Sequence, residues 1–271
     1  MRTFRLSPRT LTIAGLGTAA TALMTAAFLL QVGGETGVMW ISDIGEPAIV
    51  LISAAIVIRT GWLLGPRTLG LPWLLIGLGV AAFGLGDVVW SIIELGQGIE
   101  VPYPGLPDVF YILLYPLVAA GLLIAIAAYR RLVDVRGAAV TGAVFALGVS
   151  VALYFGFLQP LVLSQATSAG EAALNVFYPI ADVVFALGPA IVIALIVSKL
   201  GQGRLAWPWW AVVVGVIAFA LGDLGYSYLS ARDLYASGNL VDAAWSLAAA
   251  AIAVGASIVH DLAQPERWTQ T

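Results

Sequence analysis

Eight apolar runs dominate this sequence, and each is long enough to cross a lipid bilayer. A helix needs roughly 20 apolar residues to span the hydrocarbon layer. The residues are 61% hydrophobic and only 10% charged, whereas a soluble globular chain carries about 25% charged residues. We expect spans near residues 11–30, 43–60, 71–94, 107–129, 137–158, 173–198, 206–229 and 239–260. The sequence therefore predicts an all-α integral membrane protein, an eight-helix bundle without a sizeable soluble domain.

A short phrase occurs once in each half of the chain. Pro72–Trp73 and Gly86–Asp87 match Pro208–Trp209 and Gly222–Asp223, and each match is 136 positions apart. Further matched pairs are Glu46 with Asp182, Trp90 with Tyr226, Asp108 with Asp242, and Tyr111 with Trp245. Each half contributes an even number of helices, so both halves enter the membrane from the same side. We therefore expect two parallel four-helix repeats, residues 1–132 and 133–271, related by an axis along the membrane normal.

The basic residues predict the orientation in the membrane. Of the 12 Lys and Arg residues, only Arg232 falls in one set of alternate loops, and the other eleven fall at the termini or in the opposite set. These eleven are Arg2, Arg5, Arg9, Arg59, Arg67, Arg130, Arg131, Arg136, Lys199, Arg204 and Arg267. Basic residues concentrate on the cytoplasmic side, so both termini are expected in the cytoplasm. A cleaved signal peptide is the alternative for the first helix, but its removal would leave the second repeat's first helix without a counterpart.

Acidic residues lie inside the predicted spans, on one helix face in each half. Asp87, Trp90 and Glu94 share helical spacing, and so do Asp223 and Tyr226. An acid at the centre of a membrane helix costs about 2.5–3.5 kcal/mol, so these side chains must face the bundle interior or water. We infer an outward-opening pocket between the repeats. The expected ligand contacts are Asp87, Asp223, Glu46, Asp182, Asp108, Asp242, Trp90, Tyr226, Tyr111 and Trp245.

Two interpretations of these acids remain open. In the first, they only stabilise helix packing, through hydrogen bonds to Tyr hydroxyls, Trp N–H groups or helix carbonyls. In the second, they bind a small cationic or polyhydroxylated ligand from outside, because the spans carry no basic residue that would neutralise them. Tyr103 and Tyr235 are instead assigned to anchoring at the outer membrane interface.

Several kinds of chemistry find no support in the sequence. There is no cysteine, one histidine (His260) and one lysine (Lys199). Disulfides and thiol catalysis are therefore excluded, and histidine-based zinc chemistry, haem ligation by two histidines and a retinal Schiff base are not expected. No catalytic motif occurs, so we expect neither an enzyme nor a cofactor, and no nucleic-acid partner. A metal site is left open.

Several short segments resemble a known family. They are residues 106–111 (LPDVFY), 178–182 (YPIAD), 222–226 (GDLGY) and 241–245 (VDAAW). They resemble the multi-pass sensor region at the N-terminus of many bacterial GGDEF and GGDEF–EAL proteins, which make and degrade cyclic di-GMP. The resemblance implies a sensory input module in the cytoplasmic membrane of a prokaryote. It supplies no ligand and no binding residues. The chain ends at Thr271 without a catalytic output domain, so we expect output through a separate cytoplasmic or membrane partner.

The expected function is therefore a sensory or signal-relay module with an outward-facing ligand pocket. Two alternatives stand beside it. One is a transporter or channel for a small cation or polar solute, which would need a polar route through both halves of the membrane. The inner halves of the spans that carry the acids are nearly all apolar, which argues against that route. The other is a structural subunit of a larger membrane complex.

Overall fold

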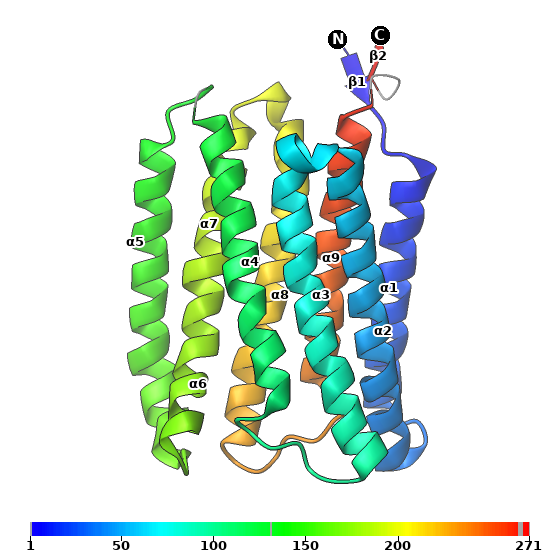
Figure 1. Cartoon of the computed structure of the whole chain (residues 1–271), viewed down its shortest axis with the longest axis vertical. Coiled ribbons are helices and arrows are strands. Elements are labelled where there is room, and N and C mark those ends of the chain that lie inside the picture. The colour runs from blue at the N-terminus through cyan, green and yellow to red at the C-terminus, as the bar shows by residue number, and fades with distance from the viewer. Residues whose placement is uncertain (1, 131, 265–267, 271) are drawn as a thin grey trace.

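The computed structural model describes residues 2–130, 132–264 and 268–270, and over these residues it is a helical bundle (Figure 1). Eight helices of the described chain are long and apolar enough to cross a membrane. This confirms the predicted all-helical membrane bundle. Arg131 and Arg267, two of the basic residues discussed above, lie outside the described residues.

Each span is either a single α-helix or an α-helix continued by π-helical or 3₁₀ segments. The α-helices are α1 (Pro8–Leu29), α2 (Gly34–Leu63), α3 (Gly70–Ser91), α4 (Leu106–Tyr129), α5 (Arg136–Leu153), α6 (Ala169–Ala181), α7 (Gly188–Ser198), α8 (Trp207–Ser230) and α9 (Leu240–Leu262). The π-helical segments are η1 (Gly65–Leu69), η2 (Ile92–Gln97), η3 (Tyr154–Val162) and η5 (Asp182–Leu187). The 3₁₀ segments are η4 (Leu163–Gln165) and η6 (Gly201–Ala206). Segments α6, η5 and α7 together form one span, Ala169–Ser198.

Both termini lie at one end of the bundle, which we call the terminal end; the opposite end is the far end (Figure 1). Two three-residue strands, β1 (Arg2–Phe4) and β2 (Trp268–Gln270), pair antiparallel at the terminal end. Asp261 ties the first helix to the last there, since it accepts 2.7 Å hydrogen bonds from the Ser7 N–H and the Thr10 hydroxyl. Ser7 also caps α1 by accepting from the Thr10 N–H.

The helices are arranged with α1 and α5 at opposite edges of the bundle (Figure 1). Helix α1 packs against α9 and α2, whereas α5 packs against α7. In the middle, α3 packs between α2 and α4, and α9 packs against both α2 and α8. The two edge spans are the least buried, and the α6–α7 span and α9 are the most buried.

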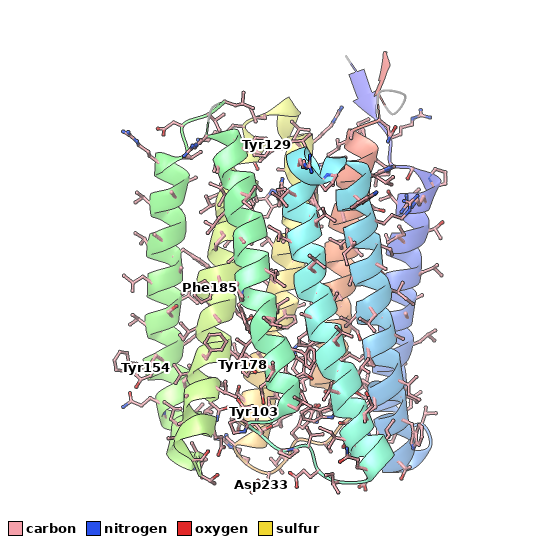
Figure 2. The ribbon with its side chains drawn as sticks, in the orientation of Figure 1. Tyr103, Tyr129, Tyr154, Tyr178, Phe185 and Asp233 are labelled. Carbon is pink, nitrogen blue, oxygen red and sulfur yellow. The ribbon has the colours of Figure 1, made fainter. Side chains whose placement is uncertain are left out.

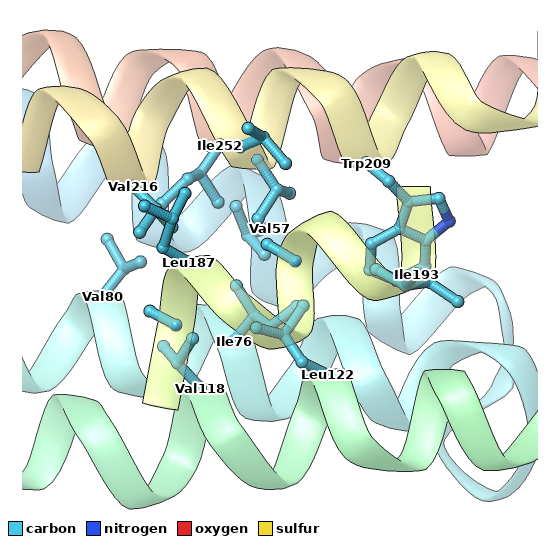
Figure 3. Close-up of a cluster of buried hydrophobic side chains, with 14 of the residues drawn as sticks. Val57, Ile76, Val80, Val118, Leu122, Leu187, Ile193, Trp209, Val216 and Ile252 are labelled. Carbon is cyan, nitrogen blue, oxygen red and sulfur yellow. The ribbon is translucent and has the colours of Figure 1, made fainter. Parts of the chain in front are cut away.

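The half of the bundle nearer the terminal end has an apolar core. Figure 3 shows part of it, including Ile76, Leu122 and Ile193, which are all fully buried. Trp73 at the start of α3 and Trp209 at the start of α8 stack on one another, with ring centroids 5.0 Å apart. Apart from Asp261, the buried acids of the described chain lie nearer the far end.

Two span boundaries differ from the prediction. The second span begins at Gly34 rather than near residue 43, because the helix continues through Glu35, Ser42 and Asp43. Ser42 and Asp43 are buried, so the interior accommodates polar side chains that would be excluded from lipid. The fifth span continues beyond residue 158 to Gln165 through the π-helical segment η3.

Candidate functional site

A polar cavity lies in the half of the bundle nearer the far end. It is enclosed by α2, α3, α4, α6, α8 and α9, and the loops 98–105 and 231–239 contribute Pro102, Tyr103, Tyr235 and Ser237 to its wall. Figure 2 shows Tyr103 and Tyr178 at this end of the molecule. The volume open to the centre of a water molecule is about 80 Å³, which is room for several waters or a small ligand.

The cavity is acidic and aromatic. Five carboxyl side chains line it: Asp43, Glu46, Asp87, Asp108 and Asp223. Ten aromatic side chains line it as well: Phe83, Trp90, Tyr103, Tyr111, Tyr115, Tyr178, Phe219, Tyr226, Tyr235 and Trp245. Among the described residues, no Lys, Arg or His belongs to the lining. Burying an unpaired charge is costly. Each carboxyl group here is therefore either protonated and neutral, or ionised beside a bound cation.

The structure brings most of the predicted site residues together. Eight of the ten line this one cavity: Asp87, Asp223, Glu46, Asp108, Trp90, Tyr226, Tyr111 and Trp245. Asp182 and Asp242 are not part of the lining. They are nearly or fully buried, 1% and 0% exposed, because both pack behind the wall against hydrogen-bond donors from neighbouring helices. The structure thus places these two predicted contacts beside the lining and not in it.

A hydrogen bond from an aromatic side chain to an aspartate, which we call a latch, joins each of two pairs of neighbouring helices. Tyr111 on α4 donates a 3.1 Å hydrogen bond to Asp87 on α3. Trp245 on α9 donates a 2.8 Å hydrogen bond from its indole N–H to Asp223 on α8. A glycine precedes each aspartate and lets the ring lie against the helix backbone. A Cβ on Gly86 would lie 2.4 Å from the Tyr111 ring, and one on Gly222 would lie 2.7 Å from the Trp245 nitrogen.

Two further hydrogen bonds join spans that are not consecutive in the sequence. Ser42 on α2 donates a 2.7 Å hydrogen bond to Asp242 on α9. Tyr178, which follows Ser42 by 136 positions, donates to Asp108 on α4. Asp242 also accepts from the Tyr235 hydroxyl at 3.1 Å and from the Gly238 N–H at 2.7 Å. Asp242 is thus a fully partnered structural carboxylate that holds the loop 231–239.

Tyr115 on α4 lies between two further acids. Its hydroxyl is 3.1 Å from Asp182 Oδ1 and 3.3 Å from Asp223 Oδ2. Asp182 opens the π-helical segment η5, a wide turn of the kind that often marks functional positions inside helices. Since one hydroxyl carries one proton, it donates to only one of the two carboxyl groups at a time. The two acids are therefore held as a pair around a shared donor.

Four buried carboxyl oxygens have no hydrogen-bond partner among the described residues. They are Asp43 Oδ2, Glu46 Oε1, Asp87 Oδ2 and Asp182 Oδ2. The first three belong to residues that line the cavity and are only 6%, 7% and 8% exposed. Buried polar atoms are nearly always paired in native proteins, so these oxygens are exceptions, and three of the four belong to residues of the cavity wall.

Aromatic rings form the wall nearest the far end. The Tyr226 ring contacts its neighbours with centroid separations of 4.7 Å to Tyr235, 5.8 Å to Tyr103 and 6.3 Å to Trp90. The indole N–H of Trp90 donates to Glu94 at 2.7 Å, and Ser237 donates to the same carboxylate. Burial raises the pKa of the Tyr103 and Tyr235 hydroxyls, so both loop tyrosines stay neutral hydrogen-bond donors.

The cavity ends against apolar side chains on the side of the terminal end. Phe83 on α3 and Phe219 on α8 both line it and meet edge to face, with centroids 4.7 Å apart. Beyond them lies the apolar core that the Trp73–Trp209 stack completes. The polar space is thus confined to one half of the bundle.

Some lining residues were missed from the sequence. Tyr103 and Tyr235 were assigned to membrane anchoring, yet both line the cavity, because their loops fold back over the end of the bundle. Asp43 was not included among the ligand contacts although it precedes Glu46 by three residues. That spacing places both acids on one face of α2 and is a signal that the sequence contains.

The carboxylates are distributed around the wall rather than gathered at one point. No group of three or more Asp, Glu, His or Cys within the described residues has the arrangement of a metal site. Comparisons of the chain with protein-family models, curated proteins and solved structures found no match. The functional argument therefore depends on the cavity itself.

Proposed function

We propose that the protein is a membrane-embedded sensory or signal-relay module, with an outward-facing ligand pocket between two parallel four-helix repeats. The observation that carries the proposal is the cavity near the far end. It combines five carboxyl side chains with aromatic walls and is bounded toward the terminal end by packed apolar side chains. A pocket accessible from one side only suits the reception of a ligand.

The proposal of two repeats is supported by contacts between matched residues. Three aromatic pairs, each 136 positions apart, touch one another across α3 and α8: Trp73 with Trp209, Phe83 with Phe219, and Trp90 with Tyr226. Residues related by a two-fold axis meet their own counterparts only close to that axis. The Tyr111–Asp87 and Trp245–Asp223 hydrogen bonds repeat in the same way. The axis of the proposed duplication therefore passes between α3 and α8 and through the cavity.

The proposed orientation has the terminal end in the cytoplasm of a prokaryotic cell. It is supported by the basic residues at that end of the bundle, among them Arg5, Arg67 and Arg136. Arg232, at the far end, is held locally: its guanidinium lies 3.8 Å above the Tyr228 ring and donates to the Leu161 carbonyl. In this orientation the cavity faces the outside of the cell.

Relay requires the ligand to favour one packing of the helices over another. A ligand in the cavity would contact α3 and α4 through Asp87 and Tyr111, and α8 and α9 through Asp223 and Trp245. Changing these latches would rotate or separate the two halves about the α3–α8 contact. The segments at the terminal end, 64–69, 132–135 and 199–206, would report that shift to a cytoplasmic or membrane partner.

A panel of small solutes tests for reception. The purified protein in lipid nanodiscs would be heated with sodium, potassium, calcium, primary amines, quaternary ammonium ions and sugars. We expect one class to raise the unfolding temperature, and the double variant Asp87→Asn, Asp223→Asn to lose that rise. Glu100→Gln, an exposed acid of the loop 98–105, is the matched control and should keep it. If the double variant keeps the full rise, the acids serve packing only.

A distance measurement tests for relay. The chain has no cysteine, so spin labels can be placed uniquely at Arg67→Cys and Arg204→Cys. We expect the active solute to change the distance distribution between these labels. Flux of the same solute through proteoliposomes, abolished by the double variant, would instead establish a transporter and contradict the sensory proposal.

A further inference from the structure

A groove on the lateral surface of the bundle lies directly behind one wall of the cavity. It runs between α2 and the α3–η2 span, and it is lined by Asp43, Ile44, Pro47, Ala48, Leu51, Val88, Ser91, Ile92 and Gly96. Ile44 and Ile92 are 56% and 55% exposed, so in a membrane span their side chains face lipid. Gly96 belongs to the last turn of its span at the far end, so the groove extends to that end of the bundle.

The groove and the cavity share part of their lining. Asp43, Pro47 and Ser91 line both spaces, so one layer of residues separates the polar cavity from the lipid-facing groove. In other directions, the loops 98–105 and 231–239 lie over the far end of the cavity, and the apolar core lies beyond its opposite side. A movement of the three shared residues would join the two spaces.

A hydrogen bond beside a proline joins the two helices at this wall. Pro47 has no N–H, so the carbonyl of Asp43 lacks the donor that a regular helix would supply four residues later. The hydroxyl of Ser91 on α3 supplies a donor instead, at 2.5 Å, and bridges α3 to α2. The same hydroxyl lies 2.8 Å from the carbonyl of Asp87 in its own helix. Because it carries one proton, it can leave Asp43 and remain hydrogen-bonded to Asp87.

We infer that the cavity opens sideways between α2 and α3, through a gate formed by Asp43, Pro47 and Ser91. In the closed state the Ser91 hydroxyl bridges the two helices, and in the open state it bonds within α3 while α2 bends at Pro47, as helices do at proline. The inference rests on the proposed function, because it names the route into the same pocket. An entering molecule passes Ile44 and Ile92, so the route favours small molecules that dissolve in the half of the bilayer nearer the far end.

Labelling of a cysteine inside the cavity measures the opening of the gate. Ser227 lines the cavity and is 3% exposed, and the chain has no native cysteine. The full chain with Ser227→Cys, in lipid nanodiscs, would be treated with N-ethylmaleimide, a neutral reagent that enters lipid. Adding Ser91→Ala removes the bridge and should speed labelling about two- to tenfold, which corresponds to the loss of one hydrogen bond. Adding Ser91→Thr keeps the hydroxyl and should leave the rate close to that of Ser227→Cys alone.

An obstruction in the groove gives an independent variant. Ala48 is exposed and lines the groove but not the cavity. Adding Ala48→Phe should therefore slow the labelling of Ser227→Cys by filling the route without altering the cavity wall. Ala127→Phe is the matched control: Ala127 is exposed on α4 and does not line the groove, so the rate should not change.

The outcomes separate the gate from the proposed function. If Ala48→Phe labels as fast as the Ala127→Phe control, the lateral route is overturned, whatever the rate of Ser91→Ala. Slower labelling in Ala48→Phe with an unchanged rate in Ser91→Ala would overturn the role of the Ser91 bridge. The sensory proposal survives both results if a solute of the panel stabilises the protein through Asp87 and Asp223.

A cavity cysteine that reacts in no variant would contradict both the gate and an accessible pocket. Thermal unfolding of each variant establishes that it is folded. Should Ser91→Ala unfold, the comparison of Ala48→Phe with Ala127→Phe still tests the lateral route, because neither substitution alters the cavity lining.

Discussion

The hydroxyl of Ser42 donates a 2.7 Å hydrogen bond to Asp242 and joins α2 to α9, 200 positions apart in the sequence. Ser42 lines the cavity, whereas Asp242 is not part of the lining and is fully buried. Together with the bonds from Tyr235 and Gly238, it makes Asp242 the point at which α2, α9 and the loop 231–239 are held together.

Replacing Asp242 should therefore reduce stability more than it alters chemistry. Asp242→Ala removes the acceptor for three buried donors, and we expect the free energy of unfolding to fall by about 2–4 kcal/mol. Reversible unfolding in detergent and denaturant measures this change. Glu100→Ala, at an exposed position of the loop 98–105, is the control and should change stability by less than about 0.5 kcal/mol.

The glycine before each latch aspartate should tolerate no side chain. In Gly86→Ala and Gly222→Ala the new methyl group would press on the rings of Tyr111 and Trp245. We expect each substitution to lower the free energy of unfolding by about 1–3 kcal/mol. Gly148→Ala on α5 is the control: nothing lies within 4 Å of the added Cβ, and replacing a helical glycine by alanine should be neutral or stabilising by up to about 1 kcal/mol. Equal effects at the three positions would contradict the close approach of the rings.

Tyr115→Phe should release the paired acids of the second half. The variant keeps the ring but removes the hydroxyl shared by Asp182 and Asp223. We expect a loss of about 1–3 kcal/mol in unfolding free energy, since the one buried donor that the two carboxyl groups share is removed. Tyr154→Phe, whose hydroxyl makes no hydrogen bond described in the structure, should be neutral. An unchanged stability of Tyr115→Phe would mean that water replaces the hydroxyl.

The helices could be predicted from the sequence because a membrane span needs a long apolar run. The membrane also predicts that the acidic side chains point into the bundle. Lipid offers no partner to a carboxylate, so Asp87 and Asp223 had to face inward, and both line one cavity. The second span is predicted to begin near residue 43, whereas its helix begins at Gly34 and already contains Ser42, which is buried beside Asp43.

The division between lining and supporting residues was not predictable from spacing. Asp182 and Asp242 share the repeat pattern of the lining acids, but the reach of Tyr115 and Ser42 places them behind the wall. The contribution of the loops to the cavity wall could not be predicted either, because it depends on loop conformation. Tyr235 and Ser237 lie outside any helical periodicity, and only the fold of the loop 231–239 brings them over the cavity.

A single introduced cysteine can establish whether the cavity is wet and open to the outside. Ser227 lines the cavity and Ser257 lies in α9 near the terminal end, and both are 3% exposed. In a chain without native cysteine, Ser227→Cys and Ser257→Cys would be treated on intact cells with impermeant cationic and anionic thiol reagents. We predict modification of Ser227→Cys alone, and faster modification by the cationic reagent than by the anionic one. An unreactive Ser227→Cys, or one modified only from the cytoplasmic side, would contradict an outward-facing acidic pocket.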